Sequence, residues 1–305
     1  MGKSYTSVGQ GTLDQLRQIV TLRRVYSAQV EKRVSVNMSE IRHAEKCVRE
    51  NYGIELRGLK ILEIGPGQFL GQLPYFARNN QVVGADSDIV AQGFDVPKYV
   101  QMFMKNGVAR TVKTIGRKVL GIDRRYRVEL RKELAVPKLP AVEIQLADAT
   151  NLPFDGSSFE FVYARAVFQH IADPALAIRE IVRVLKDRGI AFVSLHPYTS
   201  PTGCLDPRVL YGGIQNKLGL WPHLRAELKE QVRPNASLNK LGLRDWQKLF
   251  SEECAMPKFV LTKVEEKYFP LARELKESGH LKDYSLEELT TGALDVIFQK
   301  NGARS

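Results

Sequence analysis

The chain has 305 residues, of which 44% are hydrophobic and 26% are charged. This composition is typical of a globular protein and excludes a chain that is disordered throughout. The length suits one elaborated α/β domain or two small domains, and such a domain needs no metal or disulfide to stabilise its core. The net charge of +11 indicates an acidic partner, which could be a nucleic acid, an anionic membrane or a phosphorylated substrate.

The positive charge is concentrated in one segment. Residues 95–135 contain 11 basic and 4 acidic residues, a net charge of +7. The net charge of every other segment of the chain is between −1 and +4. The charge therefore belongs to a local feature and not to the whole surface.

The three cysteines, Cys47, Cys204 and Cys254, lie far apart in the chain. They show no CxxC or Cys/His spacing, so we expect buried reduced thiols, with no disulfide framework and no metal site. The N-terminus lacks the apolar core of a signal peptide, and no run of about 18 apolar residues could span a bilayer. We therefore expect a cytoplasmic protein, with peripheral contact to a membrane as one option.

The first 58 residues are predicted to form a helical cap before a domain over 59–305. Apolar residues recur at three- and four-residue steps between 12 and 50, and Asn51-Tyr52-Gly53 ends this pattern. From residue 59 on, short apolar strands alternate with helical stretches, which is typical of βαβ units.

Seven strands are expected in the main domain, with helices between them. They cover residues 60–64, 81–85, 142–146, 159–163, 190–195, 259–263 and 294–299. A helix should follow the first strand through Leu70, Leu73 and Phe76, and another should cover 174–185. The fold class is therefore α/β, with a Rossmann-like, seven-stranded, mostly parallel sheet and helices on both faces. Insertions are expected at 95–136, which is helical and basic, and at 197–257 on the substrate side.

Three strand ends carry the residues that predict a site. Gly65 and Gly67 follow the first strand, where the backbone can turn sharply and approach a ligand. Asp86 ends the second strand, where a carboxylate can accept hydrogen bonds from both ribose hydroxyls. Asp148 ends the third strand, where it could accept from the exocyclic amine of adenine. Together these positions predict a nucleoside-containing cofactor.

The arrangement resembles the class I S-adenosylmethionine-dependent methyltransferases. The matching stretches are 61–67 (ILEIGPG), 83–87 (VGADS), 147–154 (ADATNLPF), 159–163 (FEFVY) and 180–190 (EIVRVLKDRGI). The resemblance implies an S-adenosylmethionine site. Glu63, Gly65 and Gly67 would lie at the methionine part, and Asp86 at the ribose with Ser87 as a further contact. The adenine would contact Asp148 and Ala149, and the sulfonium would lie near Ala164 and Arg165, just past the fourth strand.

The glycine turn departs from the family pattern at one position. A third glycine is usual two residues beyond the second, where this chain has Phe69, with Gly71 after it. The sequence therefore does not determine the backbone path of this loop. NAD is the competing cofactor, but its fingerprint needs a glycine near the helix start, where this chain has Leu70.

Methyl transfer from a sulfonium is an in-line displacement that positioning and desolvation can drive, although an oxygen or nitrogen acceptor can need a general base. His196 and His170 both follow strands on the cofactor side and are the candidates, and a packed or capping role is the alternative for His170. We expect a small or medium-sized acceptor, such as a sugar or a lipid- or carrier-linked glycan. The alternatives are an RNA methyltransferase and a non-catalytic cofactor-binding protein of the same fold.

The basic segment 96–131 contains an apolar stripe at helical spacing. Its members are Val100, Met104, Val108, Val112, Ile115 and Val119, with Lys105, Arg110, Lys113, Arg117 and Lys118 beside them. Three interpretations remain open. The segment could be a cap packed over the active site with its charges in solvent, a contact with a membrane or lipid-linked substrate, or an RNA-binding surface.

Overall fold

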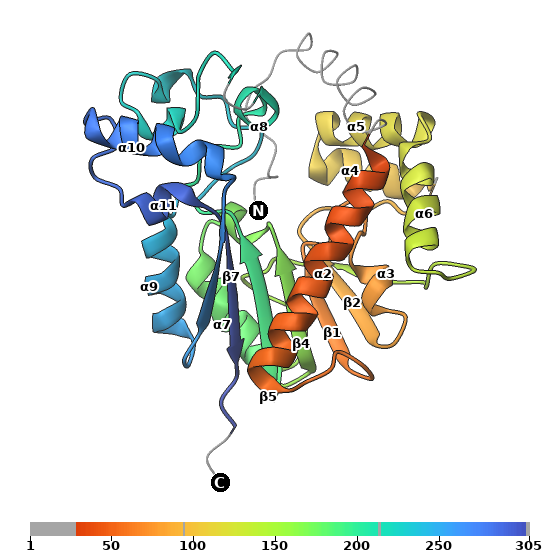
Figure 1. Cartoon of the computed structure of the whole chain (residues 1–305). Helices are drawn as coiled ribbons and strands as arrows, with labels where there is room; N and C mark the ends of the chain where they lie inside the picture. Colours follow the sequence, from red (N-terminus) through yellow and green to blue (C-terminus); the bar gives the residue numbers. More distant parts are fainter. Residues whose placement is uncertain (1–28, 94, 213–214, 303–305) are drawn as a thin grey trace.

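The computed structural model describes residues 29–93, 95–212 and 215–302. In this part of the chain one seven-stranded sheet has the order β3-β2-β1-β4-β5-β7-β6 (Figure 1). The strands are β1 (Lys60–Ile64), β2 (Gln81–Asp86), β3 (Glu143–Leu146), β4 (Phe159–Arg165), β5 (Leu185–Leu195), β6 (Lys258–Lys263) and β7 (Thr291–Gln299). Strand β7 runs antiparallel to β5 and β6, and the other pairs are parallel. The predicted Rossmann-like sheet is confirmed.

Helices cover both faces of this sheet, and others stand beyond its strand ends (Figure 1). They are α2 (Val30–Tyr52), α3 (Leu73–Phe76), α4 (Val96–Asn106), α5 (Val108–Val119), α6 (Ile122–Glu133), α7 (Pro174–Val184), α8 (Pro207–Gly212), α9 (Leu243–Glu253), α10 (Phe269–Glu277) and α11 (Leu286–Thr290). Side chains of β4 alternate between two cores, because successive residues of a strand point to opposite faces. Phe161 and Tyr163 pack with α2 and α6, whereas Val162 and Ala164 pack with α7 and α9.

Two predicted boundaries were wrong around the first and fourth strands. The helix expected through Leu70 is limited to the single turn α3, because Leu70 has the left-handed φ of 52° and Pro74 stands in the first turn of that helix. Strand β4 continues to Arg165, so Ala164 and Arg165 lie within the strand and not just past it. They pair with β5, where Ala164 lies opposite Val193.

The predictions for the N-terminal helices and for the fifth strand are confirmed only in part. Helix α2 accounts for residues 30–52 of the helical prediction and ends at Gly53, whose φ of 66° suits a glycine. Residues 12–28 of that prediction lie outside the described residues. Strand β5 begins at Leu185, five residues before the predicted start, and a register shift against β4 absorbs the Asp187-Arg188-Gly189 turn.

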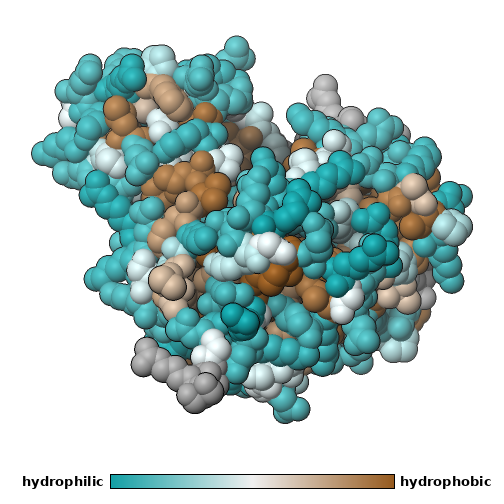
Figure 2. Space-filling model, turned by 60° about the horizontal axis from the view of Figure 1, so that its bottom comes forward, coloured by the Kyte–Doolittle hydropathy of each residue, from teal (hydrophilic) through white to brown (hydrophobic). Residues whose placement is uncertain are grey.

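Two groups of helices stand beyond the carboxyl ends of the parallel strands (Figure 1). One is the predicted basic insertion, which divides into α4, α5 and α6 at Gly107 and Gly121, with φ values of 83° and 67°. The other holds α8, α10 and α11 around a separate small core that includes Trp221 and Leu275. In Figure 2 this second lobe projects at the upper left, with hydrophobic residues at its junction with the body.

Candidate cofactor and active site

The Gly65–Gly67 turn follows β1 and is hydrogen-bonded to the end of β2. Gly65 and Gly67 have φ values of 69° and 64°, and a Cβ on Gly65 would lie 2.2 Å from a methyl of Val167. The amide of Gly65 donates to the Ala85 carbonyl at 2.7 Å, and the amide of Gly67 donates to Asp86 Oδ2 at 3.0 Å. The two glycines thus bring the backbone of the loop close to the end of β2. The order of the strands reverses on the other side of β1, between β1 and β4, and α/β proteins bind ligands at such a point.

Asp86 ends β2 and is 9% exposed. Its Oδ1 accepts the amide of Asp88 at 2.9 Å, in addition to the Gly67 amide on Oδ2. Burial raises the pKa of Asp86 to about 6, against the lowering effects of the Gly67 amide and the Arg110 guanidinium. Each carboxylate oxygen keeps the capacity to accept a second hydrogen bond. Ser87, the next residue, is half-buried.

Glu63 lies in β1 with 2% exposure, on the face of the sheet that α2 covers. Burial raises the pKa of Glu63 to about 8, and the charge of Asp86 adds to this while the Arg165 guanidinium opposes it. Arg165 itself forms an ion pair with Glu40 of α2. Within the described part of the chain no donor or acceptor reaches Glu63 Oε2. A buried carboxyl oxygen without a partner is costly and marks a position for a ligand or water.

The predicted adenine and sulfonium residues lie around the same strand ends. Asp148 is exposed after β3, and its Oδ1 accepts the Thr150 amide at 2.9 Å and hydroxyl at 2.8 Å. Ala149 packs at the edge of the core. The side chain of Ala164 is fully buried in that core, so only its backbone can reach a ligand. The side chain of Arg165 points toward α2 and Glu40.

The two candidate histidines have the same hydrogen-bonding arrangement. His170 Nδ1 lies 2.7 Å from the Ser237 carbonyl oxygen, and His196 Nδ1 lies 2.9 Å from that of Gly292. Because a carbonyl only accepts, each Nδ1 carries the proton, and in the neutral ring the lone pair is on Nε2. Burial lowers the pKa of His170, and the charges of Arg110 and His196 lower it further. Arg110 of α5 and His196 therefore lie near enough to His170 for their charges to act on it.

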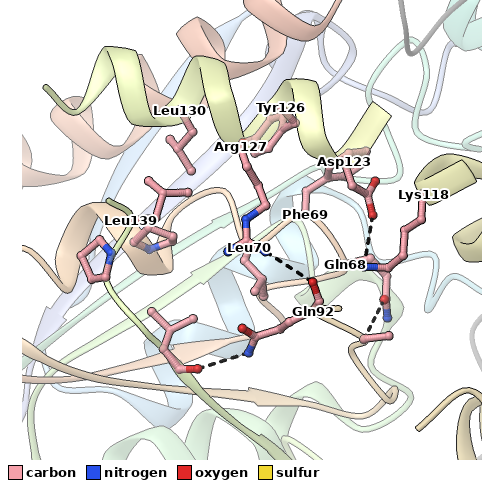
Figure 3. A pocket seen from close by; sticks show the side chains of 14 residues that line it. Gln68, Phe69, Leu70, Gln92, Lys118, Asp123, Tyr126, Arg127, Leu130 and Leu139 are labelled. Carbon is pink, nitrogen blue, oxygen red and sulfur yellow. Dashed lines mark hydrogen bonds and ion pairs between the residues drawn. The ribbon is translucent and has the colours of Figure 1, made fainter. Parts of the chain in front are cut away.

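Phe69 explains the departure of the glycine turn from the family pattern. Its ring lies 5.0 Å from that of Tyr126 and 4.5 Å from the guanidinium of Arg117, so the loop is anchored to the helical insertion. Gly71 is needed at this contact, because a Cβ there would lie 2.4 Å from Asn37 Nδ2. Figure 3 shows a pocket beside this loop of about 40 Å³, room for a water or two but not for a nucleoside.

Three residues of the site were missed from the sequence. Arg110, expected on a basic face, forms an ion pair with Asp88. Asp88 is 6% exposed. The buried side chain of Asn106 accepts from the Ile89 amide and donates to the Ile89 carbonyl, each at 2.9 Å. The Asp-Ser-Asp sequence at 86–88 was a signal for Asp88, but the helical partners come from residues about twenty positions away and have no local signature.

Other classes of site find no support in the described residues. Nowhere in the described ranges do three or more His, Cys, Asp or Glu side chains gather in a way that could hold a metal ion. All three cysteines are free and buried, as predicted. No helix among these residues is both long and apolar enough to cross a bilayer.

Comparison with known proteins points to one family. Residues 105–193 match the family model described as "Methyltransferase domain", which covers β3, β4 and most of β5 but not β1 and β2. The chain is 30% identical over 131 residues to an uncharacterized methyltransferase, YcgJ, of Bacillus subtilis strain 168, a match of 42% of this chain and 50% of the relative. It is 38% identical over 82 residues to an uncharacterized 37.1 kDa protein in transposon TN4556 of Streptomyces fradiae, a match of 27% of this chain and 24% of the relative.

Solved structures are similar at lower identity. The crystal structure of YcgJ is 16% identical with a TM-score of 0.44, and the match covers 86% of this chain and all of the other. Phosphoethanolamine N-methyltransferase 2 of Haemonchus contortus, in complex with S-adenosyl-L-methionine, is also 16% identical, with a TM-score of 0.46 and coverage of 85% and 52%. Residues 105–193 thus resemble a methyltransferase domain, and the order of the strands in the sheet is that of a Rossmann-like α/β fold.

Proposed function

We propose that the chain transfers a methyl group from S-adenosylmethionine to a small or medium-sized acceptor. The observation that carries this proposal is the pair of buried carboxyl groups, Glu63 and Asp86, beside the Gly65–Gly67 turn. Glu63 Oε2 has no partner among the described residues, and Asp86 can accept two more hydrogen bonds. The cofactor carries an ammonium group and two ribose hydroxyls. These groups are hydrogen-bond donors, and they would supply the partners that the carboxyl oxygens of Glu63 and Asp86 can still accept.

The remaining cofactor contacts follow from the same strand ends. Asp148 and Ala149 are proposed to contact the adenine, because both follow β3, the neighbour of β2. Ser87 would contact the cofactor next to Asp86. The backbone of Ala164 and the guanidinium of Arg165 are proposed to lie near the methionine end, since Arg165 influences the charge of Glu63.

The bound cofactor supplies a methyl group on a positively charged sulfur, which is a good leaving group. The protein must orient the acceptor in line with that group and exclude water, and this positioning provides much of the rate. Arg110 contributes to positioning, because its ion pair with Asp88 holds α5 over the strand ends.

His196 and His170 are proposed to hold the proton that an oxygen or nitrogen acceptor loses. In each ring the hydrogen bond from Nδ1 to a carbonyl leaves the lone pair on Nε2, as a general base requires. The pKa of His170 is lowered by burial and by neighbouring positive charge, which keeps the ring neutral at pH 7. His196 follows β5 and is the more exposed of the two.

The acceptor is proposed to be a sugar or a lipid- or carrier-linked glycan. A pocket of about 320 Å³ in the second lobe supports a ligand of this size. Its lining combines apolar side chains such as Leu210 and Leu220 with Lys263 and Tyr268. Gly292 also lines this pocket, and its carbonyl holds His196, which connects the pocket to the proposed base.

Two measurements test the proposal. Calorimetry with S-adenosylhomocysteine should show binding that is lost in Asp86→Ala, and transfer of labelled methyl from S-adenosylmethionine to sugar, lipid and RNA fractions should identify the acceptor class. Binding without transfer to any fraction would support the non-catalytic alternative. Transfer to RNA alone would contradict the proposed acceptor, and no cofactor binding at all would contradict the whole proposal.

A further inference from the structure

Helices α4 and α5 expose an apolar face. Fifteen large hydrophobic side chains in the described part of the chain are prominently exposed, and nine of them fall within residues 96–120. These nine are Val96, Val100, Phe103, Met104, Val108, Val112, Ile115, Val119 and Leu120. We call them the outer face. Most of the apolar stripe that the sequence predicts is therefore directed outward, with exposures up to 78% at Met104.

Polar contacts on the inner side hold the two helices in this orientation. Asn106, Thr111, Thr114 and Arg117 are all buried. Asn106 is hydrogen-bonded to Ile89, and Arg117 Nε donates to Asp123 Oδ1 at 3.0 Å. Rotation of the helices to bury the outer face would break these bonds and leave the Ile89 backbone and Asp123 without these partners.

The charges around the outer face have one sign. Residues 96–119 contain no Asp or Glu. Lys105 is exposed at the end of α4, Lys113 is half-buried on α5, and Arg124 and Arg125 are exposed at the start of α6. An apolar face with a cationic border complements the interface of an anionic bilayer, where apolar side chains enter the acyl boundary and cations meet the headgroups.

Other occupants fit this face less well. A symmetric contact between two copies would bring the same cations together with no acidic residue of α4 or α5 to pair with them. An RNA surface needs several aromatic rings that stack on bases, whereas Phe103 is the one aromatic residue among the nine of the outer face. Arg110 and Arg117 are also engaged in ion pairs with Asp88 and Asp123.

We infer that the outer face of α4 and α5 binds the surface of an anionic membrane. The helices would lie on the bilayer and not cross it. Their inner side carries Arg110, which is paired with Asp88 beside the cofactor strands, so the active site would stand about one helix diameter, ~10 Å, from the headgroups. The binding itself does not depend on the proposed methyl transfer, but with it the inference favours an acceptor held at a membrane.

Co-sedimentation of the full chain with vesicles tests the inference. Vesicles of phosphatidylcholine alone are compared with vesicles that contain phosphatidylglycerol. Wild type should bind only the anionic vesicles, with affinity that falls as salt rises. The variant V112S/I115S/V119S should bind them more weakly by about tenfold or more, because these apolar groups would no longer enter the interface. The K105E/R124E variant should also bind more weakly.

The matched control is L176S/M256S, which removes two exposed apolar side chains elsewhere and should bind like wild type. Calorimetry with S-adenosylhomocysteine on the same proteins separates this inference from the proposed function. If every variant binds vesicles like wild type, or if the wild type binds no vesicles while it still binds S-adenosylhomocysteine, the inference is wrong. A wild-type dimer that becomes monomeric in V112S/I115S/V119S would overturn it in favour of self-association.

Discussion

Two regions of the molecule bury charge in opposite ways. At the strand ends, burial raises the pKa of Glu63 to about 8 and of Asp86 to about 6, because the nearby cations compensate the desolvation only in part. In the helical insertion, Arg117 and Lys118 are buried against Asp123, at 3.0 Å and 3.8 Å. The insertion thus compensates its buried charge with ion pairs, apart from one nitrogen of Arg117. At the strand ends, the buried carboxyl group of Glu63 has one oxygen without a partner among the described residues.

This difference separates a structural role from a ligand-binding role. A buried ion pair with both partners present contributes to a fixed arrangement of helices. A buried carboxyl that lacks a partner costs stability and is retained where a ligand supplies the missing donor. The contrast supports the proposal that the cofactor binds at the strand ends, while the ion pairs of the insertion hold its helices in place.

The largest expected effect concerns Glu63 and pH. Its pKa is raised in the folded state, so the folded chain binds more protons than the unfolded chain between about pH 4.5 and 8, and the free energy of unfolding should fall as pH rises through this window. Glu63→Gln removes the titration and, relative to wild type, should gain about 4 kcal/mol between pH 4 and 9. Urea unfolding at several pH values measures this.

Saturating S-adenosylmethionine provides the control for this prediction. Its ammonium would pair with the ionised Glu63, so the cofactor should stabilise wild type more at pH 8 than at pH 6, while Glu63→Gln should show no such trend. Parallel stability curves of the two proteins without cofactor would mean that Glu63 is not the uncompensated group.

Arg117→Ala breaks the compensated pair in the insertion. It leaves Asp123 without its closest cation and should lower the free energy of unfolding by about 3 kcal/mol, as for other buried pairs. Arg124→Ala, which removes an exposed cation of the next helix, should change it by less than about 0.5 kcal/mol. Thermal and urea unfolding measure both. Equal effects of the two substitutions would show that burial of Arg117 contributes nothing.

Asp86→Ala tests the strand ends as a binding site. It removes the acceptor for ribose hydroxyls and the anchor for the amides of Gly67 and Asp88, so affinity for S-adenosylhomocysteine should fall by about 100-fold in calorimetry. Asp283→Asn, an exposed position in the second lobe, is the control and should bind like wild type. Unchanged affinity in Asp86→Ala would contradict the site assignment.

The smallest expected effect is on His170. Arg110 lowers the pKa of His170, so Arg110→Gln should raise it, and the change should be small because solvent partly screens this interaction. NMR titration of the imidazole protons measures this shift, with Arg124→Gln as the control that leaves the value unchanged. A constant pKa in Arg110→Gln would mean that α5 does not influence the proposed base.

The neutralisation of Lys113, Arg117 and Lys118 as one basic surface would not be a clean test of acceptor or membrane binding. The side chains of Arg117 and Lys118 are 6% and 8% exposed and are paired with Asp123, so their loss would affect stability. The three residues look equivalent in the sequence, and the structure assigns them to different environments. Lys105 and Arg124 are the better positions for a surface test, since both are exposed.

The fold class and the location of the candidate site at one edge of the sheet could be predicted from the sequence. Buried parallel strands are continuous apolar runs, and Gly65, Gly67, Asp86 and Asp148 follow such runs directly, so their shared edge of the sheet could be predicted from local pattern. Helical periodicity likewise located the apolar stripe of the insertion, but periodicity does not say which face of a helix is buried.

Which side of α4 and α5 faces inward depends on contacts between distant residues. The pairing of Arg110 with Asp88 and of Asn106 with Ile89 joins residues 17 and 22 positions apart, and together they turn the polar side of α4 and α5 inward. In the same way the raised pKa of Glu63 results mainly from burial, and its Oε2 has no partner among the described residues; no local pattern contains either property. Burial and compensation of charge are set by distant contacts, because a group is desolvated only when other parts of the chain surround it.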